Sequence, residues 1–133
     1  MTADFNQLAN FAETLFRDGF SRIGYGEFAV ATDLLTLHFA SLPGDPAAVL
    51  VRVRVLGMED VHRPEDFAKA ALAGNFFWGG TRGATLSVCE DGGLYITERR
   101  FADELADADG MESCVDDFTE TATDWRERSE LYA

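Results

Sequence analysis

The sequence of 133 residues is poor in the residue types on which metal and redox sites depend. Its two cysteines, Cys89 and Cys114, lie far apart and form no CxxC pair, so we expect two reduced thiols in the core of a cytoplasmic protein. Its two histidines, His38 and His62, have no second histidine or cysteine at ligand spacing. We expect His38 to be a partly exposed strand residue and His62 a surface loop residue, and we predict no metal and no cofactor.

The patterns of a signal peptide and of a membrane span are also missing. The first residues, MTADFNQLANF, have no basic region and no long apolar run, so no secretory signal is predicted. No window approaches about 18 uninterrupted apolar residues, which is the length that a spanning helix needs. The chain has no internal repeat and no low-complexity linker, and its length predicts a single domain over residues 1–133.

Motifs that carry catalysis are missing as well. The glycine-rich segment Gly79–Gly83 follows a predicted helix and precedes a predicted strand, which is the reverse of a phosphate-binding loop. Asp91–Gly93 lacks the spaced acids of a calcium loop, and neither Ser87 nor Ser113 lies in a G-x-S-x-G setting. An acid-rich helix is not a tuned acid/base pair, which needs a pocket that separates two pKa values. We therefore predict no catalytic residue and no enzyme.

What the chain has in excess is negative charge. Its formal net charge is −13, and residues 103–130 hold 11 Asp and Glu residues against two Arg, a net of −9. Such a charge argues against nucleic acid and against an anionic membrane surface, because like charges repel. The acidic last segment is either a solvated helix face or a docking surface for a partner, and its composition leaves both interpretations open.

Hydrophobic periodicity predicts the elements of an α+β protein. Helices are predicted over residues 3–18, 64 to about 78 and about 104–130, the last with a break near Gly110, and strands over residues 27–33, 34–41, 47–57, 84–90 and 94–100. Asp4 and Gln7 are typical of a capping pair, and Gly19 is typical of a helix C-cap. The order α-β-β-β-α-β-β-α predicts an antiparallel twisted sheet packed against helices.

Some apolar residues exceed the needs of one small core. Phe11 lies off the apolar stripe of the first helix, so it is either a second core contact or an aromatic side chain available to a partner. Phe76 and Trp78 likewise either fill the core or form an interface. The small residues Ala70 and Gly74 permit close approach of another element to the second helix. A large apolar interface on such an acidic domain would fit an obligate homodimer.

The stretch from Ala70 to Arg100 carries a series of short motifs in a specific order. A predicted helix ends in Leu-Ala-Gly-Asn at residues 72–75. It is followed by glycines with a threonine at 79–83 and by a strand that begins Ala-Thr-Leu at 84–88. An Asp-Gly turn at 91–93 then leads to a strand at 95–100 that ends in two arginines. This order resembles the class I type III secretion chaperones of the Tir chaperone (CesT-like) family. The last helix, with Phe118 and Trp125, continues the likeness, whereas the first 60 residues agree in pattern more than in phrase.

The resemblance implies a cytoplasmic, non-enzymatic homodimer that holds the N-terminal region of a secreted effector in an extended state. Its dimer contact would involve the second helix and the next strand, with the candidate residues Ala70, Ala71, Gly74, Phe77, Trp78, Ala84, Leu86 and Val88. The effector would lie beside the first helix and the sheet, with the candidate residues Phe5, Phe11, Leu15, Leu35, Leu37 and Phe39. The acidic last helix would either contact the export ATPase or keep the dimer soluble.

Two other functions fit the same residues. One is a regulatory or sensory α+β domain of the same fold outside secretion. The other is a small enzyme or ligand-binding domain, which would need a polar pocket with convergent titratable groups.

Overall fold

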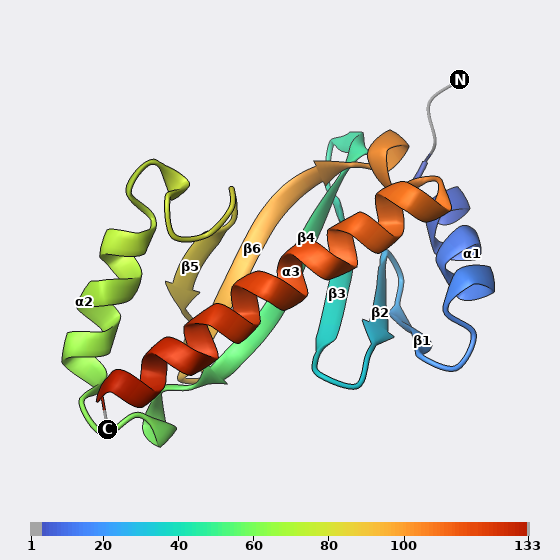
Figure 1. The fold of residues 1–133 in the computed structure, drawn as a ribbon. Coiled ribbons are helices and arrows are strands. Elements are labelled where there is room, and N and C mark those ends of the chain that lie inside the picture. Colours follow the sequence, from blue (N-terminus) through green and yellow to red (C-terminus); the bar gives the residue numbers. More distant parts are fainter. Residues whose placement is uncertain (1–3, 133) are drawn as a thin grey trace.

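The computed structural model describes residues 4–132, apart from the side chain of Phe77. Its centre is a six-stranded antiparallel sheet with the strand order β1-β2-β3-β4-β6-β5 (Figure 1). The strands are β1 Phe20–Gly24, β2 Glu27–Ala31, β3 Thr36–Leu42, β4 Asp45–Gly57, β5 Thr85–Val88 and β6 Gly93–Phe101. The α-helices are α1 Phe5–Leu15, α2 Pro64–Gly74 and α3 Ala108–Ser129. Short 3-10 helices are η1 Met58–Asp60, η2 Phe76–Trp78, η3 Ala102–Leu105 and η4 Glu130–Tyr132.

The helices cover one face of the sheet and its two ends. Figure 1 shows α3 crossing the sheet over β4 and β6, with α1 beside β1 and β2 and with α2 beside β5. The α+β class and the predicted element order are confirmed, and the structure adds the strand β1 between α1 and the first predicted strand. Four of the five residues of β1 are exposed, so this strand has no buried face that could produce a hydrophobic period.

The ends of the first helix differ in how well they were predicted. Asp4 and Gln7 form the predicted capping box, in which the Gln7 backbone N–H donates to the Asp4 carboxylate and the Asp4 N–H to the Gln7 amide oxygen. The helix ends at Leu15, with Phe16 as the C-cap, so the assignment of Gly19 as a C-cap is wrong. Gly19 instead lies against β2, where a Cβ would stand 2.3 Å from the carbonyl oxygen of Ala31.

The last helix starts later than the sequence pattern predicts. Asp107 is its N-cap, and the Asp107 carboxylate accepts a 2.7 Å hydrogen bond from the backbone N–H of Gly110. Residues before it form η3, which approaches the helix so closely that a Cβ on Gly110 would lie 1.9 Å from the Glu104 carbonyl oxygen. Gly110 is thus required by a close contact at the helix start, and the helix is not broken there.

The core lies between the sheet and α3. On β4 the valines at alternate positions are buried under the helix, whereas Leu50, Arg52 and Arg54 point to the opposite face. The predicted apolar stripe of α3 is buried throughout, and it comprises Met111, Cys114, Val115, Phe118, Ala122 and Trp125. Under α1, the ring of Phe28 stacks on Phe39 with centroids 4.8 Å apart, and Phe5 packs on Phe28 at 5.4 Å.

The two cysteines have different environments. Cys114 is buried as predicted, but Cys89 is exposed, so the expectation of two core thiols is wrong for Cys89. Cys89 directly follows β5 and begins the tight turn to β6, where its side chain is exposed to solvent. Burial raises the pKa of the Cys114 thiol to about 12. The stabilisation from this neutral thiol is complete below its ordinary pKa near 9 and is lost as the pH rises toward 12.

Thiol reactivity should separate these two residues. With a disulfide reagent at neutral pH, we expect one thiol per chain to react rapidly in the folded protein and the second only after unfolding in denaturant. The variant Cys89→Ser should lose the rapid phase, whereas Cys114→Ser should keep it. Two rapidly reacting thiols in the folded wild-type protein would contradict the described burial of Cys114.

Candidate binding surfaces

The C-terminal end of α2 is joined to the edge of β5 by one side chain. The amide of Asn75 donates to the carbonyl of Leu86 at 2.9 Å and accepts from the backbone N–H of Leu86 at 2.8 Å. β5 is an edge strand, so its outward backbone groups would otherwise be open to pairing. Asn75 thus closes this edge at Leu86 and fixes the end of α2 beside the strand.

Removing this amide should loosen the junction. The variant Asn75→Ala loses both hydrogen bonds to a buried strand residue, and we expect the free energy of unfolding to fall by about 1–3 kcal/mol. The amide hydrogen of Leu86 should exchange faster with solvent, while that of Ile96 on the paired strand should change less. Equal exchange rates for Leu86 in the variant and the wild type would contradict the role of Asn75.

Trp125 of α3 fills the space between α2 and the loop that follows it. Its Nε1 donates to the Gly80 carbonyl at 2.9 Å, and a Cβ on Gly74 would lie 2.5 Å from the indole ring. The ring of Phe67 lies 6.0 Å from it between centroids. The small residues at the end of α2 therefore permit close approach of another element, as predicted, and in this chain that element is α3.

The glycine-rich segment Gly79–Gly83 is also fixed to α3. Arg82 adopts a positive φ of 55° and places its guanidinium 2.7 Å from the carboxylate of Asp124, within reach of the Thr121 hydroxyl at 3.2 Å. The left-handed conformation is unfavourable for arginine, and the ion pair and hydrogen bond hold it. This segment thus serves as a connection between α2, β5 and α3.

Large apolar side chains remain exposed around the same junction. We call Leu72, Phe76, Trp78 and Val88 the α2–β5 patch; their exposed fractions are 70%, 75%, 54% and 52%. Trp78 and Val88 were among the predicted dimer residues, whereas Leu72 and Phe76 were not. The helical pattern could not identify Leu72, because its spacing also fits a buried face.

The other predicted dimer residues that the structure describes are less exposed to solvent. Ala71, Ala84 and Leu86 are buried within the chain, and Ala70 and Gly74 are partly buried. The side chain of Phe77 lies outside the described part of the structure. The predicted set therefore surrounds the α2–β5 patch, but only its exposed members offer surface to a partner.

The predicted effector residues divide into two layers at the other end of the sheet. Phe5, Phe11 and Leu15 of α1 are partly exposed. Leu35, Leu37 and Phe39 are buried in the core beneath them, with no exposed surface at Leu37 and Phe39. The alternation correctly grouped Leu35, Leu37 and Phe39 on one face, but that face is covered by the helices of the same chain.

Two shallow hollows lie at the two ends of α1. The apolar lining residues are Phe5, Tyr25, Leu42 and Pro46 in the first hollow and Leu15, Phe16 and Ala31 in the second. Polar residues line both as well: Asp4, Asn6 and Ser41 in the first, and Thr14, Arg17 and Asp18 in the second. Tyr25 is fully exposed in the turn between β1 and β2, a position that sequence reasoning missed because β1 itself was missed. These hollows, with mixed polar and apolar linings, are concave surfaces beside the predicted effector residues of α1.

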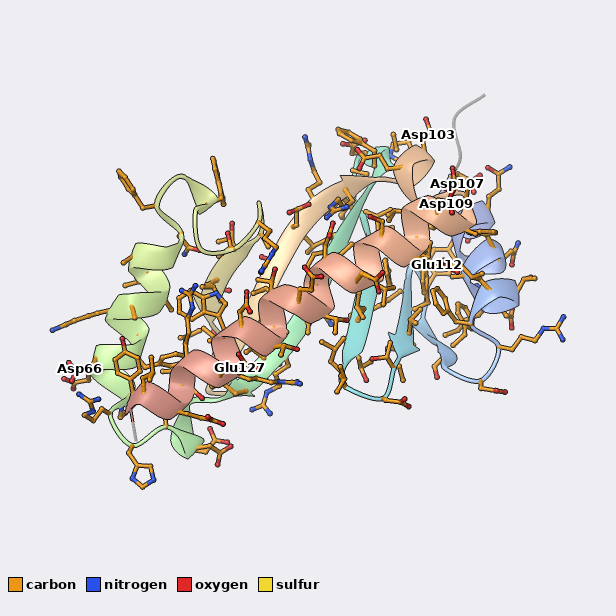
Figure 2. The ribbon with its side chains drawn as sticks, in the orientation of Figure 1. Asp66, Asp103, Asp107, Asp109, Glu112 and Glu127 are labelled. Atoms are coloured by element: carbon orange, nitrogen blue, oxygen red, sulfur yellow. The ribbon has the colours of Figure 1, made fainter. Side chains whose placement is uncertain are left out.

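The solvent-exposed surface of η3 and α3 carries many acidic side chains. Figure 2 shows Asp103 at η3, Asp107, Asp109 and Glu112 around the start of α3, and Glu127 near its end. Among the described residues no group of three or more His, Cys, Asp or Glu side chains has the arrangement of a metal site. None of the described helices is both long enough and apolar enough to span a membrane.

The amino-acid sequence matches a known protein family over most of its length. The family described as Tir chaperone protein (CesT) matches residues 6–126. The chain is a member of the Tir chaperone (CesT) family. This family consists of type III secretion chaperones, which are binding proteins and not enzymes. A search of curated proteins finds no match.

Solved structures of protein complexes share the fold of this Tir chaperone family member. The crystal structure of the ExsC–ExsE complex has a TM-score of 0.73 at 17% identity, with 96% of each chain covered. The HopA1–SchA chaperone–effector complex has a TM-score of 0.66 at 17% identity, with 92% of this chain and 91% of the other covered. The Yersinia pestis chaperone SycH with a stable fragment of YscM2 has a TM-score of 0.57 at 16% identity, with 90% and 97% covered. At such identities the likeness shows the fold alone.

Proposed function

We propose that this protein is a cytoplasmic type III secretion chaperone that binds the N-terminal region of an effector as a homodimer. The observation that carries the proposal is the exposed apolar α2–β5 patch on a strongly acidic member of the Tir chaperone family. The partly apolar α1 hollows at the other end of the sheet add a second concave surface. An apolar surface on a chain with a net charge of −13 favours a partner over solvent.

The α2–β5 patch suits contact with a second copy. Its four large side chains come from α2, η2 and β5, and a two-fold axis beside them would bring the same patch of each protomer together. Because Asn75 closes the edge of β5 at Leu86, this contact would be made by side chains and not by strand addition at that residue.

The α1 end suits an extended effector segment. Apolar side chains of the segment would enter the hollows at the two ends of α1, beside Phe5 and Leu15. β1 is the other edge of the sheet, and four of its five residues are exposed, so we expect the effector segment to add to the sheet as a strand there. Holding the effector in this way would keep it soluble and unfolded for export. Contact of α3 with the export ATPase stays a prediction.

Co-expression with the product of the adjacent gene tests the proposed function. With an affinity tag on the effector, we expect this protein to co-purify in a stoichiometric complex that is more soluble than the effector alone. Deletion of the N-terminal region of the effector should abolish the complex, whereas deletion of its remaining part should not. The proposal fails if no neighbouring effector forms a soluble complex.

A further inference from the structure

The three residues after α3, Glu130–Tyr132 of η4, lie against the start of α2, and we call them the C-terminal strap. Figure 1 shows this last turn of the chain beside the first turn of α2. Arg63 and Leu131, which form a hydrogen bond there, are 68 positions apart in the sequence, so only the fold brings the two segments together.

One arginine makes both polar links between the strap and α2. The Arg63 backbone N–H donates to the Tyr132 carbonyl at 2.9 Å, and the Arg63 Nη2 donates to the Leu131 carbonyl at 2.7 Å. Arg63 is the N-cap residue of α2, and its side chain makes no capping hydrogen bond to the helix. The strap therefore supplies an acceptor for one of the backbone donors that a helix start leaves without an internal partner.

An aromatic contact completes this attachment. The Tyr132 ring lies 5.4 Å from the Phe67 ring and 5.2 Å from the Arg63 guanidinium carbon. Phe67 has no exposed surface and also packs against Trp125, with ring centroids 6.0 Å apart. Of the eleven residues of α2, all of which the structure describes, two are buried, Phe67 and Ala71. Tyr132 thus covers one of the two positions through which α2 is anchored.

The strap itself is weakly held. Leu131 is 73% exposed and Glu130 is exposed, so Tyr132 is the strap residue whose side chain packs against the core. A segment with so few buried contacts opens at a much lower free energy than the whole fold does. Opening of the strap would expose the start of α2 and leave the sheet intact.

We propose that the C-terminal strap fixes the position of α2 and thereby controls association through the α2–β5 patch. The inference rests on the proposed function, because this patch is the surface at which we expect two copies to meet. Asn75 and Trp125 hold the end of α2, whereas its start depends on the strap. With the strap closed, Leu72, Phe76 and Trp78 are held in the arrangement that a second copy contacts. With the strap open, the start of the helix is free and that arrangement is lost in part of the molecules.

Hydrogen exchange in a monomeric background tests whether the strap holds α2. The background is the variant Leu72→Asp/Val88→Asp, in which carboxylates on the α2–β5 patch keep two copies apart, so that loss of a dimer cannot itself change the exchange of α2. Adding Tyr132→Ala should speed exchange of the Ala71 amide about tenfold, while the amide of Ile96, buried on β6, should change less than about twofold. Tyr132→Phe keeps the ring and should exchange like the background. No acceleration at Ala71, or equal acceleration at Ala71 and Ile96, would overturn the inference.

The dimer dissociation constant of the otherwise wild-type chain tests the link to association. If only molecules with a closed strap associate, this constant rises with the inverse square of the closed fraction, because both copies must be closed. A closed fraction of about one third in Tyr132→Ala would raise it about tenfold, which is the change that we expect from sedimentation equilibrium. Leu131→Ala removes a neighbouring exposed side chain, and it should associate like the wild type. An unchanged dissociation constant in Tyr132→Ala would contradict control by the strap.

The two experiments separate this inference from the proposed function. If the wild-type protein is a monomer or retains no effector, the proposed function fails, while hydrogen exchange still decides whether the strap holds α2. If the dimer and the effector complex form and Tyr132→Ala associates as tightly as the wild type, the strap inference fails and the chaperone function stands.

Discussion

Replacement of Trp125 by alanine should lower the free energy of unfolding by about 3–5 kcal/mol, the largest effect that we expect from a single substitution. Trp125 is 1% exposed and contacts Phe67 and Gly74 of α2. Its loss would leave a cavity between α2 and α3 and would leave the Gly80 carbonyl without its 2.9 Å hydrogen bond. Urea unfolding followed by circular dichroism measures the change.

The variant Trp125→Phe serves as the control because it keeps a ring in the space and removes the hydrogen bond. We expect its cost to be smaller than that of alanine by about 1–2 kcal/mol or more. The variant Phe118→Leu, at a buried position on the same stripe, tests a change of volume away from α2. A cost below about 1 kcal/mol for Trp125→Ala would contradict the central place of this side chain in the fold.

Introducing charge into the α2–β5 patch should convert the proposed dimer into a monomer. The double variant Leu72→Asp/Val88→Asp places two carboxylates on each protomer where we expect apolar side chains to meet. Each buried charge would lose its solvation without gaining a partner, so we expect the dimer dissociation constant to rise at least 100-fold. Light scattering at micromolar concentration would then report the monomer mass of 14.6 kDa instead of twice that value.

The control for this experiment uses apolar residues exposed elsewhere. Leu34 and Leu131 are 60% and 73% exposed, and neither belongs to the α2–β5 patch. Leu34→Asp/Leu131→Asp adds the same charge and should leave the dimer intact. If the wild-type protein is already a monomer, the proposed dimer is wrong. If the dimer persists in Leu72→Asp/Val88→Asp, its contact lies on another surface.

The parts of the fold that the sequence predicted best are those with one face buried under a regular element. The buried valines of β4 alternate with the less buried residues Leu50, Arg52, Arg54 and Leu56, because one side of the strand meets α3 and the other does not. The stripe of α3 that ends in Trp125 follows the helical period for the same reason. The Asp4 and Gln7 capping box was predictable because its two partners are three residues apart.

The parts that the sequence did not predict depend on contacts between distant segments. The side chains of β1 are mostly exposed, so only its pairing with β2 defines it as a strand. Leu37 and Phe39 show the alternation of a half-buried strand whether the covering layer is their own α1 or a bound peptide. Sequence patterns therefore identified the apolar faces and left Phe76 open as a core or an interface residue, while the exposure of Leu72 became visible only in the structure.

In the proposed complex, two copies of this chain hold one effector segment, and this stoichiometry can be measured. Size-exclusion chromatography with light scattering on the complex purified from co-expression measures this most directly. We predict a single species whose mass equals one effector chain plus twice 14.6 kDa. A soluble effector that elutes apart from this protein, or a complex that contains a single copy of it, would contradict the account.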